Sequence, residues 1–279
     1  MKSKIYLLLL FVFTCNALFA QKKIFTVYDS TTSSIIPYAN IWKENKIYAN
    51  ADANGKFCIE EDDVKNSFTI TCIGYLTTPI DLNSSIIHLD KEKVNLREVV
   101  ILSPKRKQKI QLGKLSGTNR WLTATYDLTI SEIGKSFSTN KEKQFYLQEV
   151  EFKTATYQEG RKMGINIYTL DEKGKPDQLI SSENIILTLK NGASITTYNF
   201  EDNLIPIPKN GFFVSAQILL VEENKQYGTS GKLTDWFFYD PAIGANKGVE
   251  DAFYFTKTEE GTWQKIPNYD LNIKVFLTD

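Results

Sequence analysis

The feature that most constrains the fold of this chain is a series of short β-type segments separated by turns, with no convincing amphipathic helix between them. From residue 23 to residue 102 these segments recur every 8 to 12 residues or so, a spacing typical of a β-sandwich. The predicted strands span residues 24–28, 38–42, 46–49, 56–59, 67–73, 86–89 and 98–102. The sequence therefore predicts an all-β fold whose first part is a seven-stranded sandwich.

A second series of β-type segments begins near residue 116. Its predicted strands span residues 122–128, 145–155, 164–169, 185–189, 194–200, 211–220, 236–239, 252–256, 262–266 and 271–277. Turns are expected at residues 171–176 and 206–211, the second because its two prolines cannot donate to a central ladder. This series predicts a jelly-roll or related antiparallel β-sandwich.

A basic segment separates the two series. Residues 103–109 contain four positive charges and no acid, and Pro104 ends the preceding strand. This composition is typical of a solvated linker. Since about 150 residues are expected per domain, the 279 residues predict two domains, residues 21–102 and 117–279, joined by a basic linker at 103–116.

The N-terminus, residues 1–20, has the pattern of a secretory signal peptide. Lys2 and Lys4 precede an unbroken apolar run at residues 5–13, and Ala20 offers a small residue for cleavage. The run covers about half of the roughly 20 residues that span a bilayer, so no transmembrane span is expected in the mature chain. Lipidation at Cys15 is disfavoured because Thr14 is bulkier than the residue that normally precedes a lipoprotein cysteine. We expect an exported protein that is periplasmic, associated with the outer membrane, or on the cell surface.

The overall charge excludes one class of partner. The chain has 33 basic and 33 acidic side chains, and loss of Lys2 and Lys4 with the signal peptide leaves a net charge of −2. Nucleic-acid binders depend on neutralising many phosphates and carry a basic face. No nucleic-acid partner is therefore expected.

Three motifs give the first domain a family resemblance. They are Asp52-Ala53-Asn54-Gly55-Lys56-Phe57, Ile73-Gly74-Tyr75 and Leu96-Arg97-Glu98-Val99-Val100. With these motifs, residues 21–102 resemble the carboxypeptidase-D regulatory-like domain, a seven-stranded transthyretin-like sandwich common in exported proteins of didermal bacteria. The resemblance implies an accessory structural unit, with Asp52, Asn54, Gly55, Phe57, Gly74, Tyr75 and Glu98 as its structural motif residues. The second half is similar to the jelly-roll domains that follow such units.

The motif residues also have a physical interpretation of their own. Asn54-Gly55 is expected to form a type I′ hairpin turn, since both positions tolerate a positive φ, and Phe57 then points into the sandwich. Gly74 is expected to let the backbone bend at the end of a strand. Tyr75 is expected to pack its ring over an open end of the core with its hydroxyl in water.

The small number of imidazoles excludes most catalytic chemistry. His88 is the one histidine, whereas a zinc peptidase site needs at least two imidazoles, and a large outer-membrane receptor barrel of about 220 strand residues does not fit the chain. There is no glycine-rich phosphate loop and no Cys/His grouping for zinc. No catalytic residue, metal ligand or cofactor is predicted, and the acidic turn at Asp171, Glu172 and Asp177 has too few oxygen ligands to assign calcium.

Paired carboxylates keep one enzymatic alternative open, because glycosidases need only two acids at a suitable separation. The candidate pairs are Glu149 with Glu151, Asp235 with Asp240, and Glu250 with Asp251. Glu149 and Glu151 share one face of a predicted strand, which fits a solvated outer face as well as it fits a site.

The segment 222–251 is the candidate ligand-binding region. Its four consecutive aromatics, residues 236–239, cannot all enter one core, because alternate side chains of a strand face opposite ways. Exposed aromatics beside Asn and Asp are a usual means of binding a sugar ring. The residues proposed for this site are Trp236, Phe237, Tyr239, Asp240 and Asn246.

The two cysteines of the first domain are expected to be unpaired. Cys72 is in phase with the core positions Phe68 and Ile70, whereas Cys58 is out of phase with Phe57 and Ile59. The two thiols should therefore face opposite sides of the sheet.

These observations favour a non-catalytic exported cell-envelope protein. The first sandwich is expected to serve as a structural unit, and the jelly-roll to bind an envelope glycan or another envelope protein. Two alternatives stay open: a glycan-active hydrolase with paired carboxylates in the jelly-roll, and a purely structural envelope-assembly protein.

Overall fold

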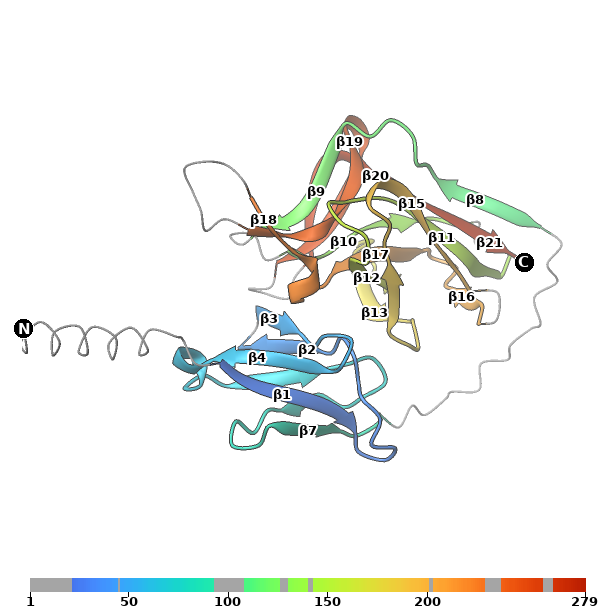
Figure 1. The fold of residues 1–279 in the computed structure, drawn as a ribbon. Helices are drawn as coiled ribbons and strands as arrows, with labels where there is room; N and C mark the ends of the chain where they lie inside the picture. Colours follow the sequence, from blue (N-terminus) through green and yellow to red (C-terminus); the bar gives the residue numbers. More distant parts are fainter. Residues whose placement is uncertain are drawn as a thin grey trace, which may run out of the picture.

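The computed structural model describes residues 22–44, 46–92, 108–125, 130–139, 143–200, 203–228, 237–257 and 263–279. In these residues the regular elements are β-strands and two three-residue 3-10 helices, η2 (Glu61–Asp63) and η3 (Glu222–Asn224). The strands form an N-terminal unit, residues 22–92, and a C-terminal unit, residues 108–279 (Figure 1). The predicted all-β sandwich fold is confirmed. No helix in the described part of the chain is long and apolar enough to cross a membrane.

The N-terminal unit consists of two small sheets. The first has the order β4-β1-β7 and the second β3-β2-β5-β6. Their bounds are β1 (Lys22–Asp29), β2 (Asn40–Lys43), β3 (Lys46–Asn50), β4 (Lys56–Glu60), β5 (Phe68–Thr71), β6 (Thr78–Pro79) and β7 (Ile86–Leu89). The predicted strand at 98–102, with Glu98, lies outside the described residues, and the short β6 was not predicted.

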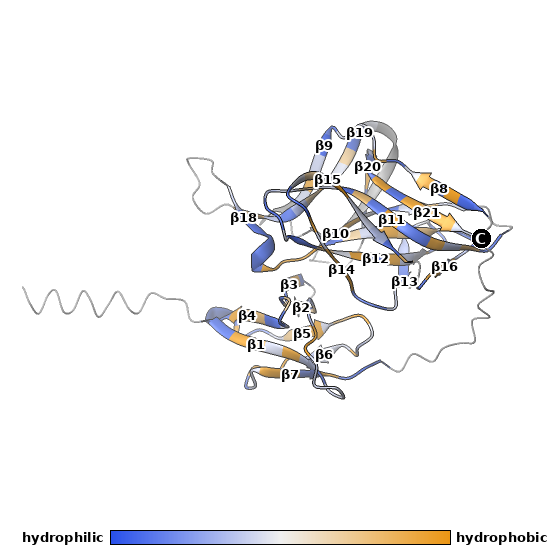
Figure 2. Ribbon diagram, turned by 45° about the vertical axis from the view of Figure 1, so that its right-hand side comes forward, coloured by the Kyte–Doolittle hydropathy of each residue, from blue (hydrophilic) through white to orange (hydrophobic). Residues whose placement is uncertain are grey.

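Alternation along the strands builds the core of this unit. Phe25 and Val27 of β1, Ile41 of β2, Ile59 of β4 and Ile70 of β5 are fully buried between the two sheets. Hydrophobic and hydrophilic residues interleave along the strands of both units (Figure 2). This pattern places one face of each small sheet in the core and leaves the other face outside it.

The two cysteines are free, as predicted, with Cys58 exposed and Cys72 half-buried. They do not lie on opposite sides of one sheet as expected, because Cys58 is in β4 and Cys72 follows β5, and these strands belong to different sheets. Burial raises the pKa of the Cys72 thiol to about 11, so this thiol stays protonated at neutral pH.

The turn at residues 52–56 differs from the expected type I′ hairpin. Gly55 has a φ of +67°, but Asn54 is not among the residues with positive φ. The Asp52 carboxylate accepts hydrogen bonds from the backbone N–H groups of Asn54 and Lys56, both at 2.8 Å. Because the Asp52 side chain organises the turn, Asn54 does not need a left-handed conformation. The strands on either side, β3 and β4, belong to different sheets, and Phe57 is buried as predicted.

The Gly74-Tyr75 motif also differs in one respect. Gly74 has a φ of +84°, which fits the predicted bend. The Tyr75 hydroxyl, however, donates a hydrogen bond of 3.0 Å to the buried Asp29 carboxylate rather than pointing into water. Burial, followed by the hydrogen bond to Asp29 and then the Asp29 charge, raises the pKa of Tyr75 to about 12.

The C-terminal unit is one continuous 14-stranded sheet that curls around a core. Its main path is β13-β12-β17-β10-β19-β11-β21-β8. The six remaining strands branch from this path: β14 pairs with β12, β15 and β16 pair with β11, and β9, β18 and β20 pair with β19. The bounds are β8 (Lys109–Gly113), β9 (Arg120–Thr125), β10 (Ile130–Phe137), β11 (Phe145–Thr156), β12 (Lys162–Leu170), β13 (Pro176–Leu179), β14 (Ile185–Thr188), β15 (Gly192–Asn199), β16 (Ile205–Ile207), β17 (Phe212–Ile218), β18 (Lys225–Tyr227), β19 (Phe237–Lys257), β20 (Trp263–Leu271) and β21 (Ile273–Thr278).

Several strand predictions need correction. β8 lies inside the predicted 103–116 linker and pairs with β21, because Ile110 and Leu112 alternate with polar residues and pack against the C-terminal core. The predicted strands 236–239 and 252–256 are parts of a single strand, β19. Pro206, expected in a turn, lies in β16, a short strand that pairs with β11. β10, β13 and β18 were not predicted.

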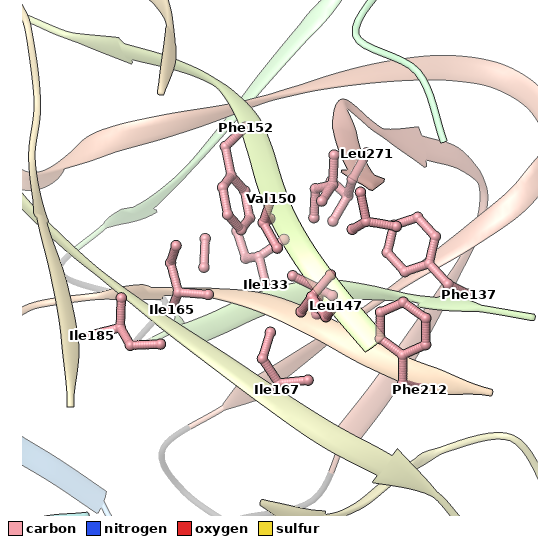
Figure 3. Close-up of a cluster of buried hydrophobic side chains, with 14 of the residues drawn as sticks. Ile133, Phe137, Leu147, Val150, Phe152, Ile165, Ile167, Ile185, Phe212 and Leu271 are labelled. Carbon is pink, nitrogen blue, oxygen red and sulfur yellow. The ribbon is translucent and has the colours of Figure 1, made fainter. Parts of the chain in front are cut away.

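The core of the C-terminal unit lies inside this curled sheet. Val150 and Phe152 of β11, Ile165 and Ile167 of β12, and Leu271 point toward one another from different strands (Figure 3). β17 is buried along its whole length. One face of β17 meets this core, and its other face lies toward the N-terminal unit.

A small polar and apolar interface joins the two units. The Leu220 N–H donates to Asn50 Oδ1 at 2.8 Å, and the Asn50 N–H donates to the Leu220 carbonyl at 3.2 Å. Tyr38 packs with Leu219 and Val221 beside this pair. The two units are therefore held in register at β3 and at the segment that follows β17.

Asn50→Ala should weaken this interface. The change leaves the buried Leu220 N–H without its acceptor, which costs about 1–3 kcal/mol. Hydrogen exchange at the Leu220 amide should become faster, and urea denaturation should show a lower midpoint. Asn54→Ala, at an exposed position of the same unit, is the control and should change neither; unchanged Leu220 protection in Asn50→Ala would contradict the role of this contact.

Candidate functional site

A cleft of about 690 Å³ lies between the two units. This volume is within the range of about 300–1,000 Å³ that is usual for small-molecule sites. The N-terminal unit contributes β2, β5 and the segment at residues 72–77, and the C-terminal unit contributes β10, β12, β17, the segment at residues 179–184 and the start of β20. Side chains of this cleft that bear on its chemistry are Asn40, Trp42, Tyr75, Glu92, Glu132, Asn166, Tyr168, Ser181, Asn184, Gln217 and Trp263.

Glu132 of β10 is the carboxylate at the floor of the cleft. The Tyr168 hydroxyl lies 2.9 Å from each of its oxygens, and the Ser215 hydroxyl donates to Oε2 at 2.6 Å. These donors come from β12 and β17, and β17 pairs directly with both β10 and β12. Three strands that are consecutive in the sheet therefore fix the position of this carboxylate.

The surroundings of Glu132 oppose its charge. Burial raises the pKa of Glu132, although hydrogen bonds from Ser215, Asn166 and Tyr168 pull it in the opposite direction. The pKa of Tyr168 is also raised, well above its usual value, first by burial and then by the neighbouring Glu132. Among the described residues, only neutral hydrogen-bond donors therefore stabilise the ionised form of Glu132.

Aromatic rings form much of the wall. Trp42, Tyr75, Tyr168 and Trp263 are each half-buried. Trp42 Nε1 donates to Thr71 Oγ1 at 2.8 Å, and the Tyr75 and Tyr168 hydroxyls donate to Asp29 and Glu132. With these polar ends bound to protein, the rings offer apolar surface to the cleft.

Trp263 is held in place by two other rings. Its ring lies 5.6 Å from that of Tyr168 and 4.9 Å from that of Phe213, both edge to face. Phe213 is fully buried. The start of β20 is thereby fixed against β12 and β17 at the edge of the cleft.

Hydrogen-bonding groups complete the lining. Gln217 Nε2 donates to Asn40 Oδ1 at 2.8 Å, which joins the two units at the cleft itself. Ser181 is only 5% exposed, yet its hydroxyl has no hydrogen-bond partner within the described residues. An unpaired buried hydroxyl on the wall of a cleft is a group that a ligand can satisfy.

The charge of the cleft is one-sided. Its lining contains the carboxylates Glu92 and Glu132, and no Lys, Arg or His is among the described residues that line it. The cleft therefore suits a neutral or positively charged ligand better than an anion.

The aromatic part of the sequence-predicted site lies on β19, away from this cleft. Phe237 and Tyr239 are half-buried, with ring centroids 5.8 Å apart, and Lys225 Nζ lies 4.3 Å from the Phe237 centroid. Phe238, on the opposite face, is buried against Tyr157. Burial raises the pKa of Tyr239 to about 12. Trp236 lies outside the described residues.

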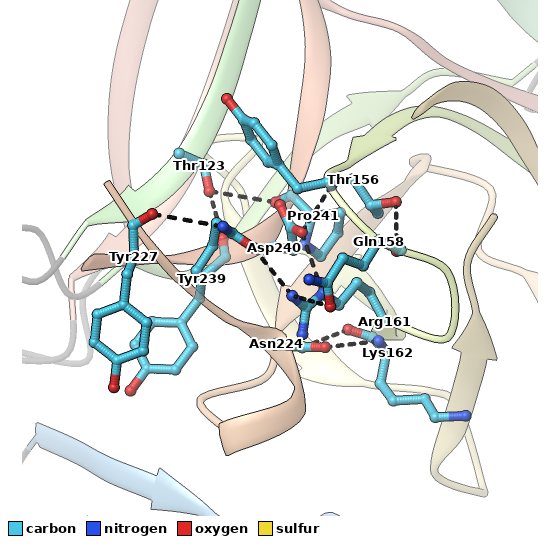
Figure 4. Close-up of polar contacts among 12 residues, drawn as sticks. Thr123, Thr156, Gln158, Arg161, Lys162, Asn224, Tyr227, Tyr239, Asp240 and Pro241 are labelled. Atoms are coloured by element: carbon cyan, nitrogen blue, oxygen red, sulfur yellow. Dashed lines mark hydrogen bonds and ion pairs between the residues drawn. The ribbon is translucent and has the colours of Figure 1, made fainter. Parts of the chain in front are cut away.

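Asp240 is buried rather than presented to a ligand. It is 1% exposed; its Oδ2 lies 3.3 Å from Arg161 Nε and accepts the Tyr157 N–H at 3.0 Å. Arg161 also donates to Gln158 and Gln226, both at 3.2 Å (Figure 4). Burial raises the pKa of Asp240, against the hydrogen bond from Tyr157 and the charge of Arg161.

Asn246 likewise serves the fold. Its amide donates to the Ser116 carbonyl at 2.8 Å and to Asn272 Oδ1 at 2.9 Å. These bonds attach the segment before β9 to β19. The prediction that Asp240 and Asn246 contact a ligand finds no support, because both side chains are buried and engaged within the protein.

The carboxylate pairs do not assemble in the cleft. Glu151 forms an ion pair with Lys274, and Asp240 pairs with Arg161. Asp235 and the side chains of Glu250 and Asp251 lie outside what the structure describes. His88 is exposed on β7, and the described residues contain no group of three or more His, Cys, Asp or Glu that could hold a metal ion.

The Asp171 turn, considered for calcium, is organised by backbone groups. Asp171 Oδ1 accepts the N–H groups of Lys173 and Lys175, both at 2.8 Å. This carboxylate therefore caps the predicted turn between β12 and β13.

Sequence reasoning missed Glu132 because it missed the strand. Residues 131, 133, 135 and 137 of β10 are buried, as is Gly134 between them, but Lys135 breaks the apolar pattern. Lys135 is accommodated only because Asp270, far along the chain, lies 2.5 Å away. Tyr75 was recognised as a motif residue, but its place beside the cleft depends on the second unit.

Comparison with known proteins leaves the family open. No protein-family model matches the chain, and no curated protein matches it. Among solved structures, the clostridial cysteine protease Cwp84 after propeptide cleavage is 11% identical with a TM-score of 0.42, over 61% of this chain and 40% of that chain.

Two further structures cover more of the chain. The cysteine protease and lectin-like domains of Cwp84, a surface layer associated protein of Clostridium difficile, are 10% identical with a TM-score of 0.42, over 91% of this chain and 62% of that one. A chain in the structure of infectious bursal disease virus Gx strain is 10% identical with a TM-score of 0.26, over 92% of this chain and 60% of that chain. The chain thus spans less than two thirds of the length of these structures, and likenesses of this size do not bear on its function.

Proposed function

We propose that this chain is a non-catalytic exported protein of the cell envelope that binds a glycan in the cleft between its two β-sandwich units. The observation that carries the proposal is the lining of the cleft: half-buried rings of Trp42, Tyr75, Tyr168 and Trp263 lie beside amides and hydroxyls. Apolar ring faces that stack on a sugar, with polar groups that fix its orientation, are the usual means of carbohydrate recognition.

The proposed location rests on the N-terminal pattern, residues 1–20, which lies outside the described residues. If the chain is exported and processed there, N-terminal sequencing of the protein from the envelope fraction should begin at Gln21. The resemblance of residues 21–102 to regulatory-like domains of exported proteins supports the same location.

Trp263→Ala should reduce glycan binding by at least about 5-fold, since stacking on one aromatic ring contributes on the order of 1 kcal/mol or more. Calorimetric titration with a panel of neutral and charged envelope oligosaccharides measures the effect. Trp121→Ala is the matched control, because Trp121 is 41% exposed on β9 and does not line the cleft. If Trp263→Ala and Trp121→Ala bind equally well, the cleft is not the site.

The hydrolase alternative has one observation in its favour. Glu132 is a cleft carboxyl with a raised pKa, as a general acid requires, and Glu92 lines the same cleft. Product analysis of the same oligosaccharides decides the matter: hydrolysis by the parent chain that Glu132→Gln abolishes would replace the non-catalytic proposal.

A further inference from the structure

Three carboxylates of the C-terminal unit each lie beside a basic side chain: Asp240 beside Arg161, Asp270 beside Lys135, and Glu151 beside Lys274. Glu132 forms no ion pair with any described residue, although it lies among buried groups at the floor of the cleft. Among the described residues, only hydroxyl and amide donors approach it.

Glu132 has room for one more donor. A carboxylate offers about four lone-pair positions; within the protein, the single protons of the Tyr168 and Ser215 hydroxyls and the amide of Asn166 approach these positions. Glu132 is a half-buried residue, and it lines the cleft. A charged donor from a ligand can therefore reach it.

The adjacent rings also suit a cation. The Tyr168 hydroxyl contacts the carboxylate directly, and the Trp263 ring lies 5.6 Å from the Tyr168 ring. The face of an aromatic ring attracts an ammonium group within about 6 Å of its centroid. With Glu92 as a second carboxylate and no basic residue among the described lining residues, the cleft combines the features that select positive charge.

We infer that the cleft recognises a protonated amino group, placed between Glu132 and the rings of Tyr168 and Trp263, so that the glycan bound there carries free amino sugars. This inference rests on the proposed glycan-binding function and adds the charge of the ligand. The ammonium supplies the countercharge that no described residue supplies to Glu132, while the sugar ring stacks on the aromatic wall.

The test compares three tetrasaccharides by calorimetric titration of the full chain at pH 6 and low salt: glucosamine tetramer, its N-acetylated form, and a tetragalacturonate. The glucosamine tetramer should bind at least about 10-fold more tightly than the N-acetylated form, and the galacturonate should bind most weakly. Added salt should weaken the binding of the glucosamine tetramer and leave that of the N-acetylated form nearly unchanged, because only the glucosamine tetramer relies on charge. This comparison needs no variant and does not depend on how a substitution folds.

The variant Glu132→Gln then tests whether Glu132 is the carboxylate that binds the amino group. It should lower the affinity for the glucosamine tetramer by at least about 10-fold and change that for the N-acetylated form by less than about 2-fold. Glu159→Gln, an exposed carboxylate on the segment after β11, should change neither.

The outcomes separate the two proposals. Binding of the N-acetylated tetramer that depends on Trp263, with no preference for the amino form, overturns the inference and leaves the glycan-binding function standing. Equal loss of both tetramers in a folded Glu132→Gln also overturns it. No binding by any tetrasaccharide overturns the glycan-binding function and this inference together.

Discussion

Replacing Arg161 with Ala should lower the free energy of unfolding by about 3–5 kcal/mol, the usual effect of removing one partner of a buried ion pair. Asp240 would stay buried with the Tyr157 N–H as its described donor, while Gln158 and Gln226 would lose the guanidinium that they share. Figure 4 shows how the side chains of three separate segments converge on this pair. Urea denaturation followed by tryptophan fluorescence measures the loss.

The pH dependence of the unfolding free energy distinguishes loss of the Arg161–Asp240 ion pair from a packing defect. The folded state raises the pKa of Asp240, so folding favours its protonated form, and the Asp240 contribution becomes less favourable as the pH rises above the ordinary value of about 4. Without Arg161 the pKa rises further. The deficit of Arg161→Ala relative to the parent chain should therefore be largest at neutral pH and shrink as the pH falls toward 4. A deficit that is independent of pH would contradict the ion-pair explanation.

Replacing Phe152 with Ala should also cost about 3–5 kcal/mol, since it removes a large side chain from a packed core. Phe152 is fully buried in the middle of β11, which pairs with both β15 and β21 at this position. In Figure 3 its side chain lies near Val150 of the same strand, Ile165 of β12 and Ile133 of β10, all members of one buried cluster.

Ile195→Ala is the matched control for Phe152→Ala. Ile195 lies on the neighbouring strand β15 but is 57% exposed, so its removal should change the free energy of unfolding by no more than about 0.5 kcal/mol. Urea denaturation of both variants tests the contrast. A loss below about 1 kcal/mol for Phe152→Ala would mean that the core collapses to fill the cavity.

Strand patterns in the sequence predicted much of the fold because alternation is a local property. Phe25 and Val27, Phe57 and Ile59, and Phe68 and Ile70 all occupy the buried phase of their strands, as a period of two requires. The same reasoning predicted that Cys58 and Cys72 are free, but not that they belong to different sheets. It failed at β10, because Lys135 occupies a core position that is tolerable only with Asp270 beside it.

The candidate site was less accessible to sequence reasoning. The aromatic run at residues 236–239 attracted attention because of its local composition, yet Phe238 is buried, and Asp240 and Asn246 serve the interior. Trp42, Tyr168 and Trp263 are far apart in the sequence, and each looks like an ordinary strand aromatic. What distinguishes them is their common position along the cleft.

The sequence by itself determined the all-β class, the division into two series of strands, and the free state of the two cysteines, because each follows from spacing and alternation between near neighbours. Only the tertiary structure decided that β8 leaves the linker to join β21, that Asp240 pairs with Arg161, and that Glu132 lies at the floor of an aromatic cleft with no cation beside it among the described residues. These features depend on which residues meet across strands and between the two units. Burial and charge pairing of that kind are set by contacts between distant segments, which no local pattern records.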